Sequence, residues 1–408
     1  MVYLIVFILL IVGVYMFDYR KRSSGELAYF GLMCLLFIAI AGLRYRIGND
    51  SIIYENNYKD LPTLFELGSF RFSSIRYEPG FIIFASIPKT FSPDFVYLQI
   101  FQAIVVNTII FWFVYKNTQN RFIALILYFI CLYVNLNTEV MREALAVCCF
   151  LLAWPFFRNG KWLLYYPLVL LAITFHISAV MLLFLPIITV PGIRYFFRLG
   201  PQVLITALIL FALGMVLQRK FFFIVEQLSA NETIVDRAAE YSKSSLGGLR
   251  LNIIGMTEQL IKNVFIPIGA LMYLKRRVKN DKDITTDTRW LKRMEMLIVA
   301  GTYFAVIALC IPIVARFNNY FGMFFYVAVA SCFFTVAYFK RKKYRLPGSY
   351  WIVILVLICA IYFKLFFANT HGSQTKKVYM IYYPYESVLD PKENYDRESI
   401  YRLFKHFK

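Results

Sequence analysis

Long apolar runs recur along the whole chain, and they restrict the possible folds more than any other feature of the sequence. Sixty per cent of the 408 residues are hydrophobic, 17% are charged, and the mean hydropathy is +0.60. A helix needs about 20 apolar residues to cross the hydrocarbon region of a bilayer, and a chain in lipid must satisfy its backbone hydrogen bonds internally. The sequence therefore predicts an all-α, polytopic membrane protein.

The apolar runs predict roughly 12 transmembrane helices, with a range of about 10 to 14. The expected spans lie near 2–19, 27–43, 95–115, 121–137, 138–157, 161–175, 177–190, 201–217, 256–274, 294–313, 318–339 and 350–367. A shorter run at 80–91 follows Pro79 and predicts a re-entrant or interfacial helix. The predicted organisation is a bundle over 1–367, with outer loops 44–94 and 218–261, followed by an outer tail over 368–408.

The distribution of basic residues predicts the orientation of this bundle. Lysine and arginine are about three times as dense in one set of alternate loops as in the other, and the positive-inside rule places the denser set in the cytoplasm. The denser set comprises 18–26, 116–121, 158–161, 191–200, 275–293 and 340–348. Both termini and the loop 44–94 are therefore expected outside, and the unusual polar residues at the ends of the spans gather on that face.

The overall charge and the cysteines exclude several other classes of protein. A formal net charge of +20 in a membrane protein reflects cytoplasmic loops that face anionic lipid, so no nucleic-acid partner is expected. All seven cysteines lie inside apolar runs, without CxxC spacing or a neighbouring histidine. They are expected to be buried apolar side chains, and neither a disulfide nor a metal site nor a cofactor is predicted.

Four arginines at the predicted outer face are candidate ligands for a diphosphate: Arg44, Arg46, Arg142 and Arg316. An ionisable side chain within a span is costly, which makes Arg142 the strongest candidate of the four. The planar guanidinium suits phosphate oxygens better than the ammonium group of lysine does. For Arg142, the structural alternative is an ion pair with Glu139. For Arg316, it is a long side chain whose guanidinium simply reaches the membrane–water interface.

Two carboxylates and a histidine are the candidates for proton transfer. Asp50 or Glu78 can act as general base on a sugar hydroxyl if its geometry and pKa allow. The structural alternatives are a turn-forming role for Asp50 and an arginine partner for Glu78. His176, in the sequence FHIS, is a third candidate, although a lone histidine often serves packing alone.

Most of the tyrosines are expected in the interfacial belts of the membrane. The tail sequence YYPYES contains Tyr383 and Tyr385 on either side of Pro384, an aromatic turn able to stack on sugar rings at the outer mouth. Tyr54, in the outer loop 44–94, is a further candidate for glycan contact. Simple packing of the tail against the bundle is the alternative.

Taken in order, these motifs resemble the EpsG family of Wzy-like polymerases. The resemblance rests on Arg46 to Asp50 with Tyr54, Glu78 to Phe81, Arg142 with Ala144 to Ala146, Phe175 to Ser178, Arg316-Phe317, and Tyr383 to Tyr385. It implies a metal-independent glycosyltransferase of GT-C-like architecture in the bacterial cytoplasmic (inner) membrane. The expected substrate is an oligosaccharide repeat unit carried on undecaprenyl diphosphate, and a chain-length regulator and other polysaccharide-assembly proteins are possible partners.

Two other functions remain open from the sequence. A ligase or acyltransferase would act on the same lipid-linked glycans by different chemistry. A flippase would move the lipid-linked unit across the membrane, and it would require charged side chains along the depth of the bundle. The charges in this chain gather mainly at one face, which favours the polymerase.

Overall fold

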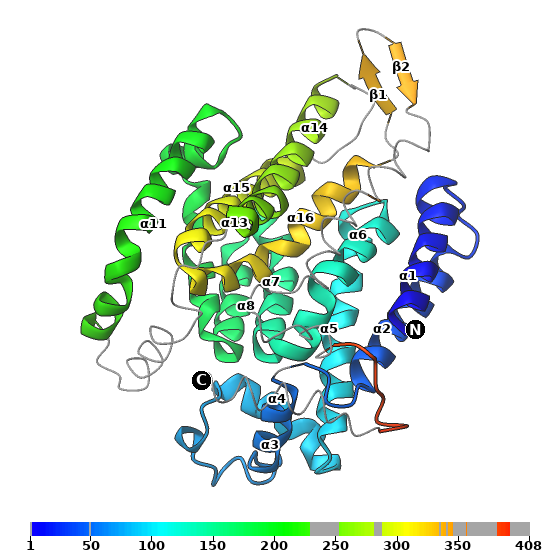
Figure 1. Cartoon of the computed structure of the whole chain (residues 1–408), viewed down its shortest axis with the longest axis vertical. Coiled ribbons are helices and arrows are strands. Elements are labelled where there is room, and N and C mark those ends of the chain that lie inside the picture. The colour runs from blue at the N-terminus through cyan, green and yellow to red at the C-terminus, as the bar shows by residue number, and fades with distance from the viewer. Residues whose placement is uncertain are drawn as a thin grey trace. The chain divides into compact units, whose positions relative to one another are not determined.

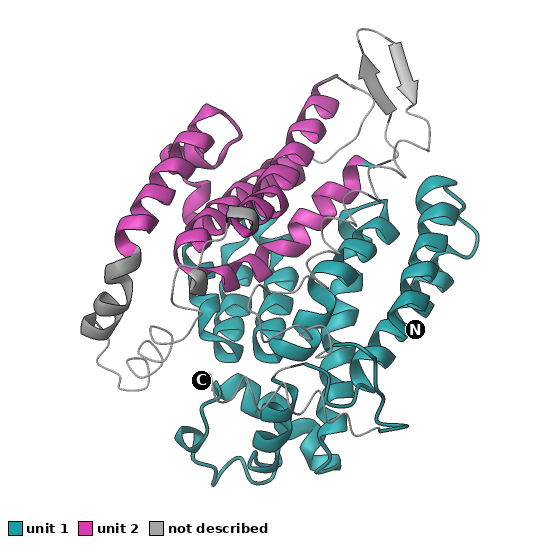
Figure 2. Cartoon of the chain, viewed as in Figure 1, with its two compact units in different colours: residues 1–185, 333–400 teal, residues 186–332, 401–408 magenta. Residues whose placement is uncertain are grey.

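Helices form nearly all of the described part of the chain. The computed structural model describes residues 2–48, 50–228, 253–280, 288–333, 336–339, 342–345, 356 and 382–391 (Figure 1). The chain divides into two compact units, one of residues 1–185 with 333–400 and the other of residues 186–332 with 401–408 (Figure 2). The predicted span 350–367 and most of the loop 218–261 lie outside the described residues.

The first unit is a helical bundle with one small hairpin. Its elements are α1 (Val2–Gly13), η1 (Val14–Tyr19), α2 (Glu26–Gly42), α3 (Ser51–Lys59), η2 (Phe72–Ser74), α4 (Pro79–Phe91), α5 (Phe95–Asn117), α6 (Arg121–Tyr128), η3 (Phe129–Tyr133), η4 (Asn135–Glu139), α7 (Met141–Asn159), α8 (Trp162–Phe175), η5 (Ile177–Val180), α9 (Met181–Phe184), β1 (Val336–Phe339) and β2 (Lys342–Arg345). Helix α7 packs against both α8 and α5, and α2 packs along α5. The short helix α4 rests on α5 and α8 and buries Phe81, Ile82 and Phe84.

Two π-helical turns interrupt the segment between α6 and α7. These turns, η3 and η4, accompany a buried polar cluster: Asn107 donates to Asn137 Oδ1 at 3.1 Å, and Tyr128 donates to Asn107 Oδ1 at 2.9 Å. Buried amides must be hydrogen-bonded, and a π-turn shifts the helix face so that they can be. A regular period of 3.6 residues does not predict this shift.

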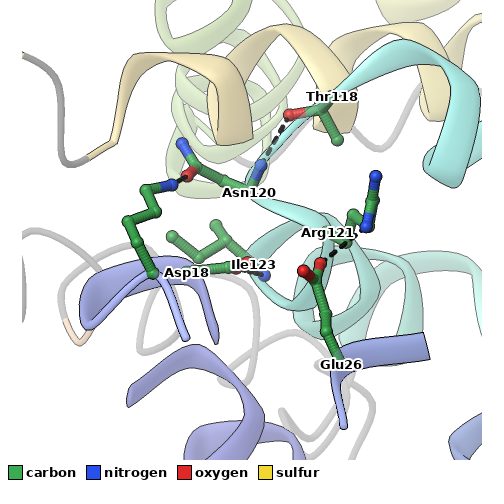
Figure 3. Close-up of polar contacts among 7 residues, drawn as sticks. Asp18, Glu26, Thr118, Asn120, Arg121 and Ile123 are labelled. Carbon is green, nitrogen blue, oxygen red and sulfur yellow. Dashed lines mark hydrogen bonds and ion pairs between the residues drawn. The ribbon is translucent and has the colours of Figure 1, made fainter. Parts of the chain in front are cut away.

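A cluster of polar contacts ties η1 and α2 to the start of α6 (Figure 3). The buried carboxylate of Asp18 accepts a hydrogen bond from the backbone N–H of Ile123 at 2.8 Å, and Arg121 pairs with Glu26 at 2.6 Å. Lys21 donates to Asn120 Oδ1 at 2.8 Å. Since the first turn of a helix has unpaired N–H groups, Asp18 caps α6 from a neighbouring segment.

The second unit is built around α15 (Thr288–Cys310). Its other elements are η6 (Leu185–Thr189), which begins at the last residue of the first unit, and then α10 (Pro191–Arg194), η7 (Tyr195–Phe197), α11 (Pro201–Leu228), α13 (Ile253–Leu260), η8 (Ile261–Phe265), α14 (Ile266–Asn280), η9 (Pro312–Phe317) and α16 (Asn318–Cys332). Helices α11, α14 and α16 all pack against α15. Val203, Val299 and Tyr303 form a buried apolar cluster between α11 and α15.

The structure agrees with the helical class but gives fewer complete spans. Among the described residues, three helices are long and apolar enough to cross a membrane: Val2–Tyr19, Phe95–Asn117 and Thr288–Cys310. A pair bent by 96°, Ile177–Thr189 with Pro191–Phe197, makes a fourth if it counts as one span, and several shorter apolar helices are also present. The figure of about twelve therefore stays a prediction.

One boundary was predicted wrongly. The expected span 318–339 ends as a helix at Cys332, and Val336–Phe339 instead pairs with Lys342–Arg345 as an antiparallel hairpin. The sequence of this strand, VAYF, mixes β-branched and aromatic residues that favour extended backbone. Hydropathy alone does not distinguish such a strand from the end of a helix.

Candidate functional site

The centre of the candidate site is an ion pair between Arg142, at the start of α7, and Glu78, just before α4. Arg142 Nη1 pairs with Glu78 Oε2, and both side chains are largely but not completely buried. Within the described residues, Nε of Arg142 has no hydrogen-bond partner. Arg142 therefore pairs with Glu78 and not with Glu139, the partner considered from helical spacing, and its Nε is buried beside that pair.

An aromatic cage surrounds the guanidinium of Arg142. Its central carbon lies 4.8 Å from the centre of the Tyr77 ring, a cation–π distance, and its charge acts on Tyr54. Tyr77 stacks on Tyr54 at 5.8 Å and meets Phe81 edge-on at 5.2 Å. Burial raises the pKa of the Tyr77 phenol. The cage fixes the direction of the guanidinium and limits its contact with water, which strengthens its interaction with an anion.

The sequence Glu78-Pro79-Gly80-Phe81 explains how α4 delivers the carboxylate. Pro79 occupies the first helical position, where a missing N–H costs nothing. A Cβ on Gly80 would clash with the side chain of Thr174 and lie 2.7 Å from its carbonyl oxygen, so only glycine lets α4 approach α8 this closely. Phe81 is fully buried against the cage. Each residue of the motif thus helps to set the position of Glu78.

The loop before α3 brings Asp50 close to Glu139. Gly48 adopts a φ of +102° and lies against Thr138 and Glu139, where a side chain would be both strained and crowded. The backbone N–H of Asp50 donates to Glu139 Oε2 at 3.3 Å. Asp50 immediately precedes α3, and its side chain makes no capping hydrogen bond to that helix.

The C-terminal tail is attached to the same region. The backbone N–H of Tyr45 donates to Glu386 O, and that of Val388 donates to Leu43 O, both at 2.9 Å. Tyr382 donates to Glu139 Oε1 at 2.7 Å, and burial followed by the charge of Glu139 raises the pKa of this phenol. The described tail, residues 382–391, therefore forms a strap across the end of α2 and the end of η4.

The two candidate tyrosines of this strap differ in exposure. Tyr385 donates to Ile40 O at 3.1 Å and packs edge-on against Tyr3 at 5.8 Å, and burial raises its pKa to about 12. Tyr383 is 40% exposed. Tyr54, in contrast, is buried inside the cage. Of the three predicted glycan contacts, Tyr383 is therefore the most accessible.

Arg44 and Arg46 make contacts with the protein itself. Arg44 is 2% exposed, donates to Ala41 O at the end of α2, and has its pKa lowered by burial to about 10, so it stays charged at neutral pH. Its charge there complements the negative end of the α2 dipole. Arg46 forms a two-pronged pair with Glu55, with contacts of 3.0 and 3.3 Å. The diphosphate role predicted for these two arginines stays a prediction.

The remaining predicted residues are His176, directly after α8, and Arg316, in the second unit. His176 is 7% exposed and caps η5, because its Nδ1 accepts the N–H of Ser178 at 3.2 Å and lies 2.7 Å from Ser178 Oγ. This contact matches the packing role considered from sequence. Arg316 lies in η9 of the second unit, so its association with Arg142 stays a prediction.

A comparison with family models finds one match, to the model described as the EpsG family, over residues 27–387. The chain belongs to the EpsG family. This EpsG protein is therefore a membrane protein of polysaccharide biosynthesis, and the resemblance noted from its ordered motifs is confirmed. Comparison with curated proteins and with solved structures finds no match. The matched region ends inside the strap, so the EpsG region includes both the cage and the segment attached beside it.

Sequence reasoning missed two parts of the site in this EpsG protein. Tyr77 was not singled out, although its position directly before Glu78 was a usable signal, and Asn57 donates to its hydroxyl at 2.7 Å. Glu139 was considered only as a partner of Arg142, whereas it joins the strap to the Asp50 loop. No group of three or more His, Cys, Asp or Glu that could hold a metal occurs among the described residues.

Proposed function

We propose that this protein is a polymerase that joins undecaprenyl-diphosphate-linked oligosaccharide repeat units at the outer face of the bacterial inner membrane. The product would be a capsule, exopolysaccharide or O-antigen chain, and the architecture would be GT-C-like. The observation that carries this proposal is the cage around Arg142, which holds a permanently charged and partly exposed guanidinium beside the carboxylate of Glu78 and the ring of Tyr77. Membership of the EpsG family supports the same reading.

In the proposed reaction, a hydroxyl at the non-reducing end of the acceptor attacks the anomeric carbon of the donor chain. A new C–O bond forms, the bond to the diphosphate oxygen breaks, and undecaprenyl diphosphate leaves. Negative charge develops on that leaving oxygen, where Arg142 stabilises it. The hydroxyl proton passes to a carboxylate, for which Asp50 and Glu78 are the candidates.

We infer different roles for Glu78 and Asp50 from their contacts with neighbouring residues. Glu78 holds the Arg142 fork in one orientation, so its loss would affect both charge and geometry. Asp50 is half-buried and is carried on the loop that meets Glu139. Tyr383, as the accessible aromatic ring of the strap, is the proposed stacking surface for a sugar.

The polar groups inside the first unit support the polymerase over a flippase. A path for a charged lipid headgroup would need cations or acids along its length. In the first unit the buried cluster of Asn107 and Asn137 is neutral, and the buried ionisable side chains Asp18, Arg44 and Glu143 lie at or near helix ends. The ligase alternative shares the same donor and differs only in the acceptor. Only the product distinguishes it from the polymerase.

Deletion of the protein in its host tests the proposal directly. Single repeat units should accumulate where polymer is normally made, since polymerisation fails after the units reach the outer face. The measurement is the size distribution of surface glycans and lipid-linked glycans in the deletion strain and its parent. Repeat units held on the cytoplasmic leaflet would contradict the polymerase and indicate a flippase. Polymer of normal length that lacks only its final attachment would indicate a ligase.

Thiol labelling in intact cells tests the orientation of the site. Ser69 and Ser24 are both exposed, in the predicted outer and cytoplasmic loops, whereas Ser51 is only 1% exposed and unsuited as a reporter. An impermeant thiol reagent should label Ser69→Cys and leave Ser24→Cys unlabelled until the membrane is opened. The parent protein controls for its native cysteines. The reverse pattern would place the cage on the cytoplasmic side.

A further inference from the structure

The second unit contains a basic pocket of about 540 Å³ that the proposed polymerisation does not use. Four of its lining residues are cationic: Arg198, Lys275, Lys279 and Lys292. Glu295 is the only acid among the described lining residues. The four cations come from 191–200 and 275–293, two segments that the distribution of basic residues independently predicts to lie on the same, cytoplasmic face.

The carboxylate of Glu295 already forms a hydrogen bond and an ion pair within the protein. Glu295 is 4% exposed, accepts the backbone N–H of Leu199 at 2.6 Å and pairs with Lys275 at 2.7 Å. It therefore fixes the segment before α11 against α14 and α15 and neutralises one of the four cations. The other three cations have no second acid beside them among the described residues that line the pocket.

The other three cations point to an anionic ligand. Arg198, Lys279 and Lys292 are exposed, and none of their side chains forms an ion pair with another described residue. These three cations line one pocket and repel one another, and an anion that binds among them removes that repulsion.

The remaining lining residues suit a ligand with an apolar part. Tyr195, Val278 and Leu291 contribute aromatic and aliphatic surface to the same pocket. We propose that this pocket binds the phosphate group of an anionic ligand, as the headgroup of an anionic phospholipid or as a free polyphosphate. The ammonium group of lysine attracts phosphate as a compact positive charge, and the guanidinium of arginine can bind two phosphate oxygens at once. Anionic lipid is concentrated at the cytoplasmic surface of the membrane.

The test uses the full-length protein purified in a neutral detergent. Thermal unfolding is followed as phosphatidylglycerol, inorganic pyrophosphate or phosphatidylcholine is added. The variant carries Lys279→Gln with Lys292→Gln. The control carries Arg22→Gln with Lys161→Gln, which removes the same charge from exposed positions predicted to lie on the same face.

An anionic ligand should raise the unfolding temperature of the parent and the control. The apparent affinity of the variant should fall by roughly tenfold or more, because each basic group near a phosphate contributes on the order of 1 kcal/mol. A response to phosphatidylglycerol alone identifies the lipid as the source, and a response to pyrophosphate as well identifies the phosphate group itself. Equal responses in variant and control, or equal responses to phosphatidylcholine, would overturn the proposal.

Discussion

Cells that carry Arg142→Ala are expected to accumulate single repeat units and to make no detectable polymer. The substitution removes the charge and the hydrogen-bond donors proposed to stabilise the departing diphosphate, and loss of one such group typically costs about 10²–10³ in rate. It also leaves the carboxylate of Glu78 largely buried and without its arginine. The measurement is the size distribution of lipid-linked and surface glycans, with immunoblotting of the membrane fraction.

Two further variants separate the proposed chemistry from folding. Arg158→Ala removes an arginine from the other end of the same helix, and polymer should be retained. Arg142→Ala combined with Glu78→Ala removes both members of the pair, so that no buried charge is left alone. This double variant should restore the protein level without restoring polymer. If it restored polymer of normal length, the pair would be structural and the role of Arg142 in diphosphate binding would be lost.

The second large effect is expected at a position that carries no functional group. Gly80→Ala places a Cβ against the backbone of Thr174, and backbone cannot move aside as a flexible side chain can. Overpacking of this kind typically costs about 1–3 kcal/mol, and here it also displaces Glu78, two residues earlier. We expect a lower unfolding temperature in detergent together with a severe loss of polymer.

Gly68→Ala provides the matched control for this substitution. Gly68 lies in the same region, 44–94, and no described atom approaches the position of its added Cβ within 4 Å. Its stability and polymer should match those of the parent protein. If Gly80→Ala behaved like Gly68→Ala, the close contact between α4 and α8 would not position Glu78.

Parts of the site could be predicted from sequence because they depend on membrane physics alone. An arginine inside an apolar run is costly wherever it occurs, and this singled out Arg142 without a structure. Its partner was not predictable in the same way. Glu78 lies 64 residues earlier, and the pairing depends on how closely α4 approaches α8, which Gly80 determines.

The wrong details share a physical cause. Hydropathy reports how apolar a segment is but not its backbone geometry, so the strand at Val336–Phe339 was predicted as the end of a helix. Apolar runs also do not report the π-turns between α6 and α7, because these depend on the local hydrogen-bonding pattern of the backbone.

The strap formed by the tail has a consequence for the order in which the protein is made. Tyr385 contacts Ile40 across 345 positions of the chain, and Tyr382 contacts Glu139 across 243. A ribosome must therefore pass residue 382 before Glu139 can receive the hydrogen bond from Tyr382. A nascent chain that has not yet reached this residue lacks the contact even when α2 and α7 are already made, so the region around Glu139 is completed long after its own helices are synthesised.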